Sequence, residues 1–315
     1  MQKKVLITGV SGFVGSHLVS YLSSNKEYSL FGTFFSAKET TFNKDLTLTK
    51  VDLTNSNEVL SFLDSIKPDL VFHLAGLSAP SLSFKDPQKV ITTNALVQIN
   101  ILEGLKNSNK DARILSVTSA DIYGIVKKED LPIDEETPFR PANPYAVSKI
   151  TQDYLAFQYF TSYGLQIIRV RPFNHIGPGQ SPDFVVSSFA KKIATIEKGK
   201  IEPVMLVGNL EAKRDFTDVR DIVTAYEQAI NKGKAGEAYN IGSGVSHKIS
   251  EILEKLISLS NVKITIEQDP KLLRPSDEPE LVCDNRKFVN LTSWKPQISL
   301  EKSLKDTLDY WRNKV

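Results

Sequence analysis

The sequence predicts an α/β protein: a doubly wound parallel sheet of the Rossmann type with a smaller, interleaved C-terminal domain. Apolar strand-like runs and helix-like stretches alternate through residues 3–171, the pattern of a parallel sheet covered by helices on both faces. Prolines and glycines then crowd residues 172–182, and the elements beyond them are less regular. The 315 residues, with 41% hydrophobic content, suffice for about two domains.

Short apolar runs and apolar residues at helical spacing define the individual elements. The predicted strands are 5–7, 28–35, 46–53, 70–74, 112–119, 165–171 and 262–267. The predicted helices are 13–22, 55–66, 88–107, 144–163, 184–197, 219–232, 249–260 and 300–312. We expect a first domain at 1–171, to which 215–242 returns, and a second domain formed by 172–214 and 243–315. Ligands are expected at the carboxyl ends of the parallel strands.

A glycine-rich turn joins the first strand to the first helix. Gly9 permits a tight turn, Gly12 lets the backbone approach a pyrophosphate, and Gly15 lets the helix pack against the strand. Free N–H groups at the helix N-terminus favour bound phosphate. The first domain is therefore predicted to bind a dinucleotide through Gly9, Ser11, Gly12, Phe13, Val14 and Gly15.

The second and third strands indicate which dinucleotide is bound. No acidic residue follows the second strand, where an acid would bind the ribose hydroxyls of NAD, and the first basic residue is Lys38. This favours NADP(H), with NAD(H) as the other possibility. Asp52, at the end of the predicted third strand and beside Leu53, is expected to accept from the adenine amino group or else to cap a surface turn.

Small residues after the fourth strand suit a backbone pressed against the cofactor. They are Leu74, Ala75 and Gly76, and Pro172 is expected to contact the cofactor from the sixth strand. The amide of Asn94, on helix 88–107, either braces a backbone carbonyl at the active site or is solvated; we predict it among the cofactor-binding residues.

A tyrosine and a lysine on helix 144–163 have the spacing of a proton-transfer pair. Tyr145 and Lys149 are four residues apart and share one helix face. A phenol with a pKa near 10 is a poor acid–base at neutral pH, but an adjacent ammonium and a cationic nicotinamide stabilise the phenolate. Ser119, at the end of strand 112–119, would hydrogen-bond the same substrate oxygen. We predict that these three residues catalyse hydride transfer; the alternative is a half-exposed Tyr–Lys pair on an amphipathic helix.

Charge and cysteine content narrow the functional classes. The net charge of +2 is spread along the chain and predicts neither nucleic-acid nor membrane binding. Cys283 is the only cysteine, so an internal disulfide and a thiolate metal cluster are impossible, and no metal site is predicted. Without a signal-peptide core or a long apolar run, we expect a cytoplasmic protein.

The motifs together resemble the extended short-chain dehydrogenase/reductase family, which acts mostly on nucleotide sugars. The resemblance rests on Gly9–Gly15, Ser119 and Tyr145-x-x-x-Lys149, and it is most specific at 171–180, 208–219 and 273–279, which are similar to the GDP-mannose branch. It implies an oxidoreductase that reduces the 4-keto group of GDP-4-keto-6-deoxy-D-mannose to GDP-D-rhamnose. It also implies a nucleotide-sugar-binding second domain and a homodimer formed through helices 88–107 and 144–163.

The resemblance also assigns residues to the GDP-linked sugar. Arg214 and Arg274 lie in loops bounded by proline and glycine, and their guanidinium groups suit bidentate contact with a diphosphate. Asn174 can contact a sugar or phosphate oxygen, and Asp277 or, alternatively, Glu278 a ribose diol or a guanine edge. The alternative is that Arg214–Asp215 and Arg274–Asp277 are surface ion pairs. The predicted substrate contacts are Ser119, Asp121, Tyr145, Asn174, Arg214, Arg274 and Asp277.

Three further functions remain open from the sequence. A 4,6-dehydratase must also remove the C5 proton and assist loss of the C6 hydroxyl; similar dehydratases carry a glutamate where this chain has Asp121 and a polar residue where it has Ala120. Relatives on the reductase side also carry a carboxylate there, so Asp121 alone does not separate the two. The same motifs are compatible with a nucleotide-sugar epimerase and with a cofactor-binding regulatory protein that has lost catalysis.

Overall fold

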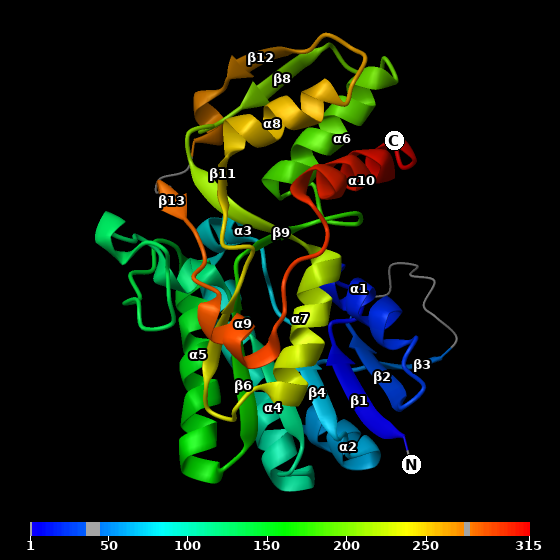
Figure 1. Ribbon diagram of the computed structural model, residues 1–315. Helices are drawn as coiled ribbons and strands as arrows, with labels where there is room; N and C mark the ends of the chain where they lie inside the picture. The colour runs from blue at the N-terminus through cyan, green and yellow to red at the C-terminus, as the bar shows by residue number, and fades with distance from the viewer. Residues whose placement is uncertain (1, 36–44, 274–277) are drawn as a thin grey trace.

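The computed structural model describes residues 2–35, 45–273 and 278–315. Among these residues, the main element is a seven-stranded parallel sheet in the order β10-β6-β5-β4-β1-β2-β3 (Figure 1). Its strands are β1 (Lys3–Thr8), β2 (Tyr28–Phe34), β3 (Leu46–Lys50), β4 (Leu70–His73), β5 (Arg113–Val117), β6 (Gln166–Pro172) and β10 (Ala238–Ile241). The chain moves outward in opposite directions from β1 and β4, so the ligand crevice is expected between these two strands. The predicted doubly wound sheet is confirmed.

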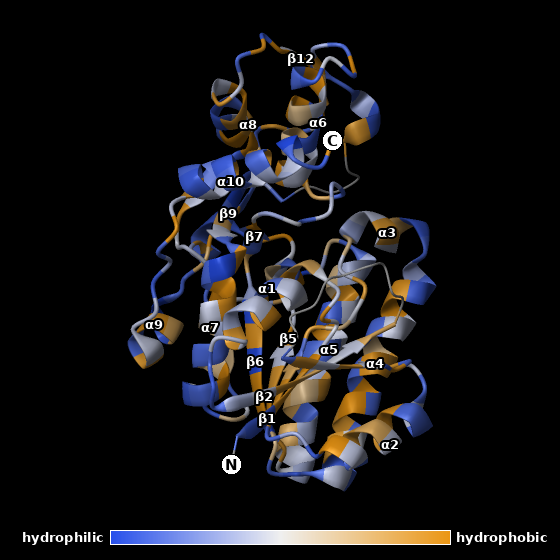
Figure 2. Ribbon diagram, turned by 90° about the vertical axis from the view of Figure 1, so that its right-hand side faces the viewer, coloured by the Kyte–Doolittle hydropathy of each residue, from blue (hydrophilic) through white to orange (hydrophobic). Residues whose placement is uncertain are grey.

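Helices cover both faces of this sheet (Figure 2). The bounds are α1 (Phe13–Leu22) and α7 (Val219–Lys232) on one face, and α2 (Ser56–Ile66), α4 (Pro87–Ser108) and α5 (Pro144–Tyr163) on the other. Successive strand residues point to opposite faces: Ile7 packs with α1 and α7, whereas Leu6 packs with α2 and α4. Both are fully buried, which explains the continuous apolar runs of these strands.

Local capping determines where several elements begin and end. Pro144 starts α5, the Asn143 side chain accepts from the Ala146 N–H at 2.8 Å, and Gly164 ends the helix in the left-handed conformation. The predicted bounds 144–163, 219–232 and 300–312 are confirmed. Strands 46–53 and 112–119 were predicted too long, because they end at Lys50 and Val117 and turns follow.

A second group of elements lies over the carboxyl edge of the sheet (Figure 1). Strand β9 (Lys213–Asp218) pairs with β7 (Asn174–Ile176), β11 (Ser246–Lys248) and β13 (Glu280–Leu281), and β8 (Val204–Val207) pairs with β12 (Thr265–Gln268). Helices α6 (Val185–Glu197), α8 (Ile249–Ser258) and α10 (Leu300–Arg312) surround one apolar core. The sequence prediction missed most of these short strands, as well as α3 (Pro80–Lys85) and α9 (Arg286–Thr292).

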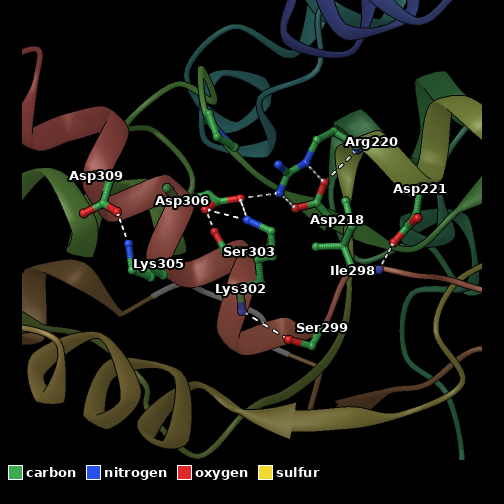
Figure 3. Close-up of polar contacts among 12 residues, drawn as sticks. Asp218, Arg220, Asp221, Ile298, Ser299, Lys302, Ser303, Lys305, Asp306 and Asp309 are labelled. Atoms are coloured by element: carbon green, nitrogen blue, oxygen red, sulfur yellow. Dashed lines mark hydrogen bonds and ion pairs between the residues drawn. The ribbon is translucent and has the colours of Figure 1, made fainter.

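An ion-pair network joins this second group to the sheet helices (Figure 3). The Arg220 guanidinium, at the start of α7, donates to both carboxylate oxygens of Asp218 and to Asp306 on α10, each at 2.8 Å. The neighbouring Asp221 carboxylate accepts from the Ile298 N–H at 2.9 Å. Helix α7 is thus held to the chain that leads into α10. The division into 1–171 with 215–242, and 172–214 with 243–315, stays a prediction.

Candidate active site

The glycine turn forms a cradle that a larger residue would fill. Gly9 has a φ of 74°, and its N–H and that of Val10 both donate to Thr33 O at 3.2 Å. A Cβ on Gly15 would lie 2.3 Å from Gly9 O, so only glycine permits this approach of α1 to the turn. Gly12 is the N-cap of α1 and makes no side-chain capping bond, which leaves first-turn N–H groups for phosphate. The cradle therefore fits the diphosphate of a dinucleotide.

A cavity of about 980 Å³ lies at the carboxyl edge of the sheet and extends into the second group of elements. Its walls include all the predicted cofactor residues except Asn94: Gly9, Ser11, Gly12, Phe13, Val14, Gly15, Asp52, Leu53, Leu74, Ala75, Gly76, Tyr145, Lys149 and Pro172. The volume and the mixed polar and apolar lining suit an extended ligand.

Asp52 lies in the loop two residues beyond β3 rather than on the strand. One of its carboxylate oxygens accepts from the Thr54 N–H at 2.9 Å and the Thr54 hydroxyl at 2.7 Å. This oxygen therefore caps a turn, which was the alternative prediction for Asp52. The residue also lines the cavity.

Asn94 is the predicted cofactor residue that does not line the cavity. It is fully buried; its amide donates to Leu77 O at 3.0 Å and to Ser148 Oγ at 2.9 Å, and its Oδ1 accepts from the Leu77 N–H at 2.7 Å. The bracing alternative is confirmed and the solvated one is wrong. Its placement among the cofactor-binding residues stays a prediction; in this structure the side chain ties the loop after β4 to α5.

A buried threonine and histidine support the same loop. Thr8 Oγ1 accepts from the N–H groups of Leu74 and Ala75, each at 3.1 Å, so its proton is directed to His73 Nδ1 at 2.9 Å. Burial, followed by the charge of Lys149, lowers the pKa of His73 to about 3. His73 is therefore neutral, with its proton on Nε2, and it helps to fix the backbone of the cavity floor.

The three predicted catalytic residues meet in this cavity. Ser119 N-caps a short 3₁₀ helix (Ala120–Tyr123): its Oγ accepts from the Asp121 N–H at 3.2 Å, and its side chain hydrogen-bonds Tyr145. Lys149 Nζ lies 5.9 Å from the centroid of the Tyr145 ring and donates to Val117 O at 3.2 Å. Tyr145 and Lys149 are both buried, so the half-exposed surface pair is wrong.

Burial dominates the electrostatics of this group. It raises the pKa of Tyr145 above its ordinary value; the charge of Asp121 adds to this, and the hydrogen bond with Ser119 opposes it. Burial also lowers the pKa of Lys149 to about 8. The lowering of the tyrosine pKa expected from Lys149 does not appear in this structure. Tyr145 is therefore a protonated phenol beside a lysine that titrates close to neutrality.

The predicted substrate contacts Arg214, Asn174 and Asp121 also line the cavity. Arg214 Nη1 donates to Glu278 O at 2.7 Å, and Nη2 lies 3.4 Å from Glu278 Oε2. The proposed surface pair with Asp215 is wrong, because the Asp215 carboxylate is buried and accepts from Ser243, Gly244 and Cys283. Arg274 and Asp277 lie outside the described residues.

Several polar residues that line the cavity were not predicted from the sequence, among them Lys192 and Asn209. Lys192 of α6 lines the cavity and donates to Leu206 O at 3.2 Å, and Asn209 lines it from the turn after β8. Lys192 looks like any solvated lysine on an amphipathic helix. Asn209 lies in the family-like segment 208–219, which was the available signal, but an asparagine in a turn usually has a structural use. In the described part of the chain, no group of three or more His, Cys, Asp and Glu side chains could hold a metal ion.

Comparison with known proteins assigns this architecture to a family. The family model described as GDP-mannose 4,6 dehydratase matches residues 6–307, and the chain belongs to that family.

Particular relatives are similar over nearly the whole chain. GDP-6-deoxy-D-mannose reductase of Pseudomonas aeruginosa is 35% identical over all of this chain and 99% of its own. GDP-6-deoxy-D-talose 4-dehydrogenase of Aggregatibacter actinomycetemcomitans is 31% identical, covering 91% of this chain and 90% of its own. The structure of RMD from Pseudomonas aeruginosa, complexed with NADPH, superposes with a TM-score of 0.87 at 34% identity and covers all of both chains. Within the described residues, no helix has the length and apolar character needed to cross a bilayer.

Proposed function

We propose that this protein reduces the 4-keto group of GDP-4-keto-6-deoxy-D-mannose to give GDP-D-rhamnose. The observation that carries the proposal is that Ser119, Tyr145 and Lys149 lie in one cavity with the glycine cradle and Arg214. Full-length similarity to GDP-6-deoxy-D-mannose reductase supports the substrate class. The enzyme is accordingly a nucleotide-sugar 4-ketoreductase.

Each of the site residues has a separate role in the proposed reduction. A nicotinamide cofactor held at the glycine cradle would supply the hydride for C4 of the sugar. Tyr145 gives its phenolic proton to the oxygen at C4, and its raised pKa keeps that proton available at neutral pH. Ser119 hydrogen-bonds the same oxygen and aligns it, and Lys149 stabilises the phenolate that remains. Arg214 and Asn174 bind the diphosphate and the sugar.

Dehydration is the second candidate, because the family carries that name. Removal of the C5 proton and loss of the C6 hydroxyl need two further proton-transfer groups. Ala120 is buried and has no proton to transfer. Asp121 is one methylene shorter than glutamate, about 1.5 Å, and misplacement by about 1 Å costs about a hundredfold in rate. Ala120 and Asp121 together therefore favour reduction over dehydration.

NADPH is the favoured hydride donor, with NADH as the alternative. β2 and the following Phe35 contain no carboxylate that would repel a 2′-phosphate. The similar RMD structure holds NADPH. We further propose a cytoplasmic homodimer that contains the two predicted domains. The buried, free thiol of Cys283 suits a reducing compartment, and exposed apolar side chains on α4 and α5 support the dimer.

Two incubations with product analysis test the proposal. With GDP-4-keto-6-deoxy-D-mannose, NADPH should be consumed one for one, and NMR should identify GDP-D-rhamnose rather than its C4 epimer, the 6-deoxytalose compound. GDP-mannose without added cofactor should give no keto sugar. Formation of that keto sugar would make the protein a dehydratase. Interconversion of sugars without net cofactor consumption would make it an epimerase.

A further inference from the structure

The cavity contains two lysines, Lys89 and Lys192, to which the proposed function gives no role. Within the described residues, four lysines and arginines line it: Lys89, Lys149, Lys192 and Arg214. Lys149 lies at the catalytic tyrosine, and Lys192 and Arg214 lie on α6 and β9. A dinucleotide carries two negative charges on its pyrophosphate, and NADP carries more on its 2′-phosphate, whereas the glycine cradle offers only neutral N–H groups.

Lys89 lies on α4, the helix that lines the cavity beside the loop predicted to contact the adenine. Thr93 and Val97, one and two turns further along α4, also line the cavity, as does Leu53, the neighbour of Asp52. Lys89 is solvent-exposed. Among the described residues, its ammonium group makes no hydrogen bond or ion pair with the protein, although its backbone N–H donates to Asp86 Oδ1 at 3.0 Å. The charge is therefore available to a ligand.

The position of Lys89 is unfavourable for its own helix. Asp86 is the N-cap of α4, so Lys89 is the third helical residue. A cation in the first turn opposes the helix dipole, which favours acidic residues there. Helix stability thus does not account for a lysine at this site, and departures from local preference concentrate at functional positions.

We propose that Lys89 binds a phosphate group of the dinucleotide cofactor and supplies the charge that the glycine cradle lacks. This inference rests on the proposed cofactor. The pyrophosphate and the 2′-phosphate share the same chemistry, and comparison of NADPH with NADH distinguishes them.

Binding measurements without sugar test this role. Dissociation constants of NADPH and NADH should be measured by fluorescence titration for wild type, Lys89→Gln and Lys85→Gln. Lys85, four residues earlier at the end of α3, is exposed, does not line the cavity and loses the same charge when changed. A hydrogen bond to a charged group is worth about tenfold in affinity, so Lys89→Gln should weaken NADPH by about that factor and Lys85→Gln should not.

The pattern across the two cofactors identifies the phosphate. If Lys89→Gln weakens the binding of NADPH and NADH equally, Lys89 contacts the pyrophosphate. If it weakens the binding of NADPH alone, Lys89 contacts the 2′-phosphate. In the absence of cofactor, the melting temperature of Lys89→Gln should equal or exceed that of wild type, because an unfavourable charge has left the first turn of α4. Lys89→Arg should retain most of the affinity.

Two results would overturn the inference. One is that Lys89→Gln binds NADPH and NADH with the same dissociation constants as Lys85→Gln. The other is weaker binding with a lower melting temperature that Lys89→Arg does not restore. Either result leaves the reductase assignment standing, because wild-type turnover tests that separately. Conversely, a wild-type protein that binds NADPH but reduces no keto sugar would refute the assignment without affecting Lys89.

Discussion

At the residue scale, the proposed chemistry depends on one phenolic proton. Tyr145→Phe removes the proton donor while keeping the buried ring, so the fold and the NADPH affinity should be unchanged. General acid catalysis is worth about 100- to 10,000-fold, and kcat should fall by that amount. Tyr154→Phe, an exposed tyrosine on the same helix, is the matched control and should retain wild-type kcat. Wild-type turnover by Tyr145→Phe would remove this residue from the mechanism.

The titration of Lys149 should appear in the alkaline limb of the pH profile. Burial lowers its pKa to about 8, so the ammonium is present below that pH and is lost as the pH rises through it. The raised pKa of Tyr145 keeps the phenol protonated over the same range. We expect kcat/KM, which reports groups of the free enzyme, to decline above about pH 8. In Lys149→Arg the guanidinium stays charged, and residual activity should show no decline there; an identical limb in that variant would contradict the assignment.

At this scale, the sequence predicts which residues gather at the site better than it predicts what each side chain contacts. Tyr145, Lys149 and Ser119 were predictable because their spacing on adjacent elements has few other uses. Asn94 was not, because an amide on a helix face looks the same in sequence whether it contacts a ligand or braces a loop. Only the packing of the loop after β4 against α5 distinguishes the two.

At the scale of elements, capping and apolar periodicity predict long helices, whereas short strands depend on tertiary pairing. Helices α5, α7 and α10 begin and end where predicted, because an N-cap side chain starts each of them and because α7 and α10 bury apolar stripes. β7, β11 and β13 have three residues or fewer. Such segments form strands only because they pair with β9, and no local sequence pattern predicts that pairing.

The contact between α7 and α10 is one that stability measurements can isolate. The Asp306 side chain is 20% exposed, and it accepts from Arg220 across the two helices and from Lys302 of its own helix (Figure 3). Asp306→Asn should lower the free energy of unfolding by about 1 kcal/mol, the upper end for exposed pairs. Lys302→Gln breaks only the i,i+4 pair that Asp306 makes within α10 and should cost about 0.3–0.5 kcal/mol. Urea unfolding should show this order, and equal losses would mean that the cross-helix bond adds nothing.

At the scale of the whole molecule, the two groups of elements enclose one cavity, so neither binds both ligands alone. The cradle and Tyr145 come from the sheet side, while Arg214 and Lys192 come from β9 and α6. Because the alternation of strands and helices is local, the sequence predicted the sheet. It did not predict how the short strands converge over the sheet edge, because those pairings join segments distant along the chain.

The proposed dimer places α4 and α5 against the same helices of a second copy. Leu96 on α4 is 41% exposed, and Tyr154 and Phe157 on α5 are 57% and 41% exposed. Burial of apolar side chains drives association of this kind, so a charge there should oppose it. Leu96→Asp should shift the protein toward monomer in light scattering at micromolar concentration. Leu60→Asp is the matched control, because Leu60 is also 41% exposed but lies on α2. A wild-type monomer, or equal behaviour of the two variants, would place the interface elsewhere.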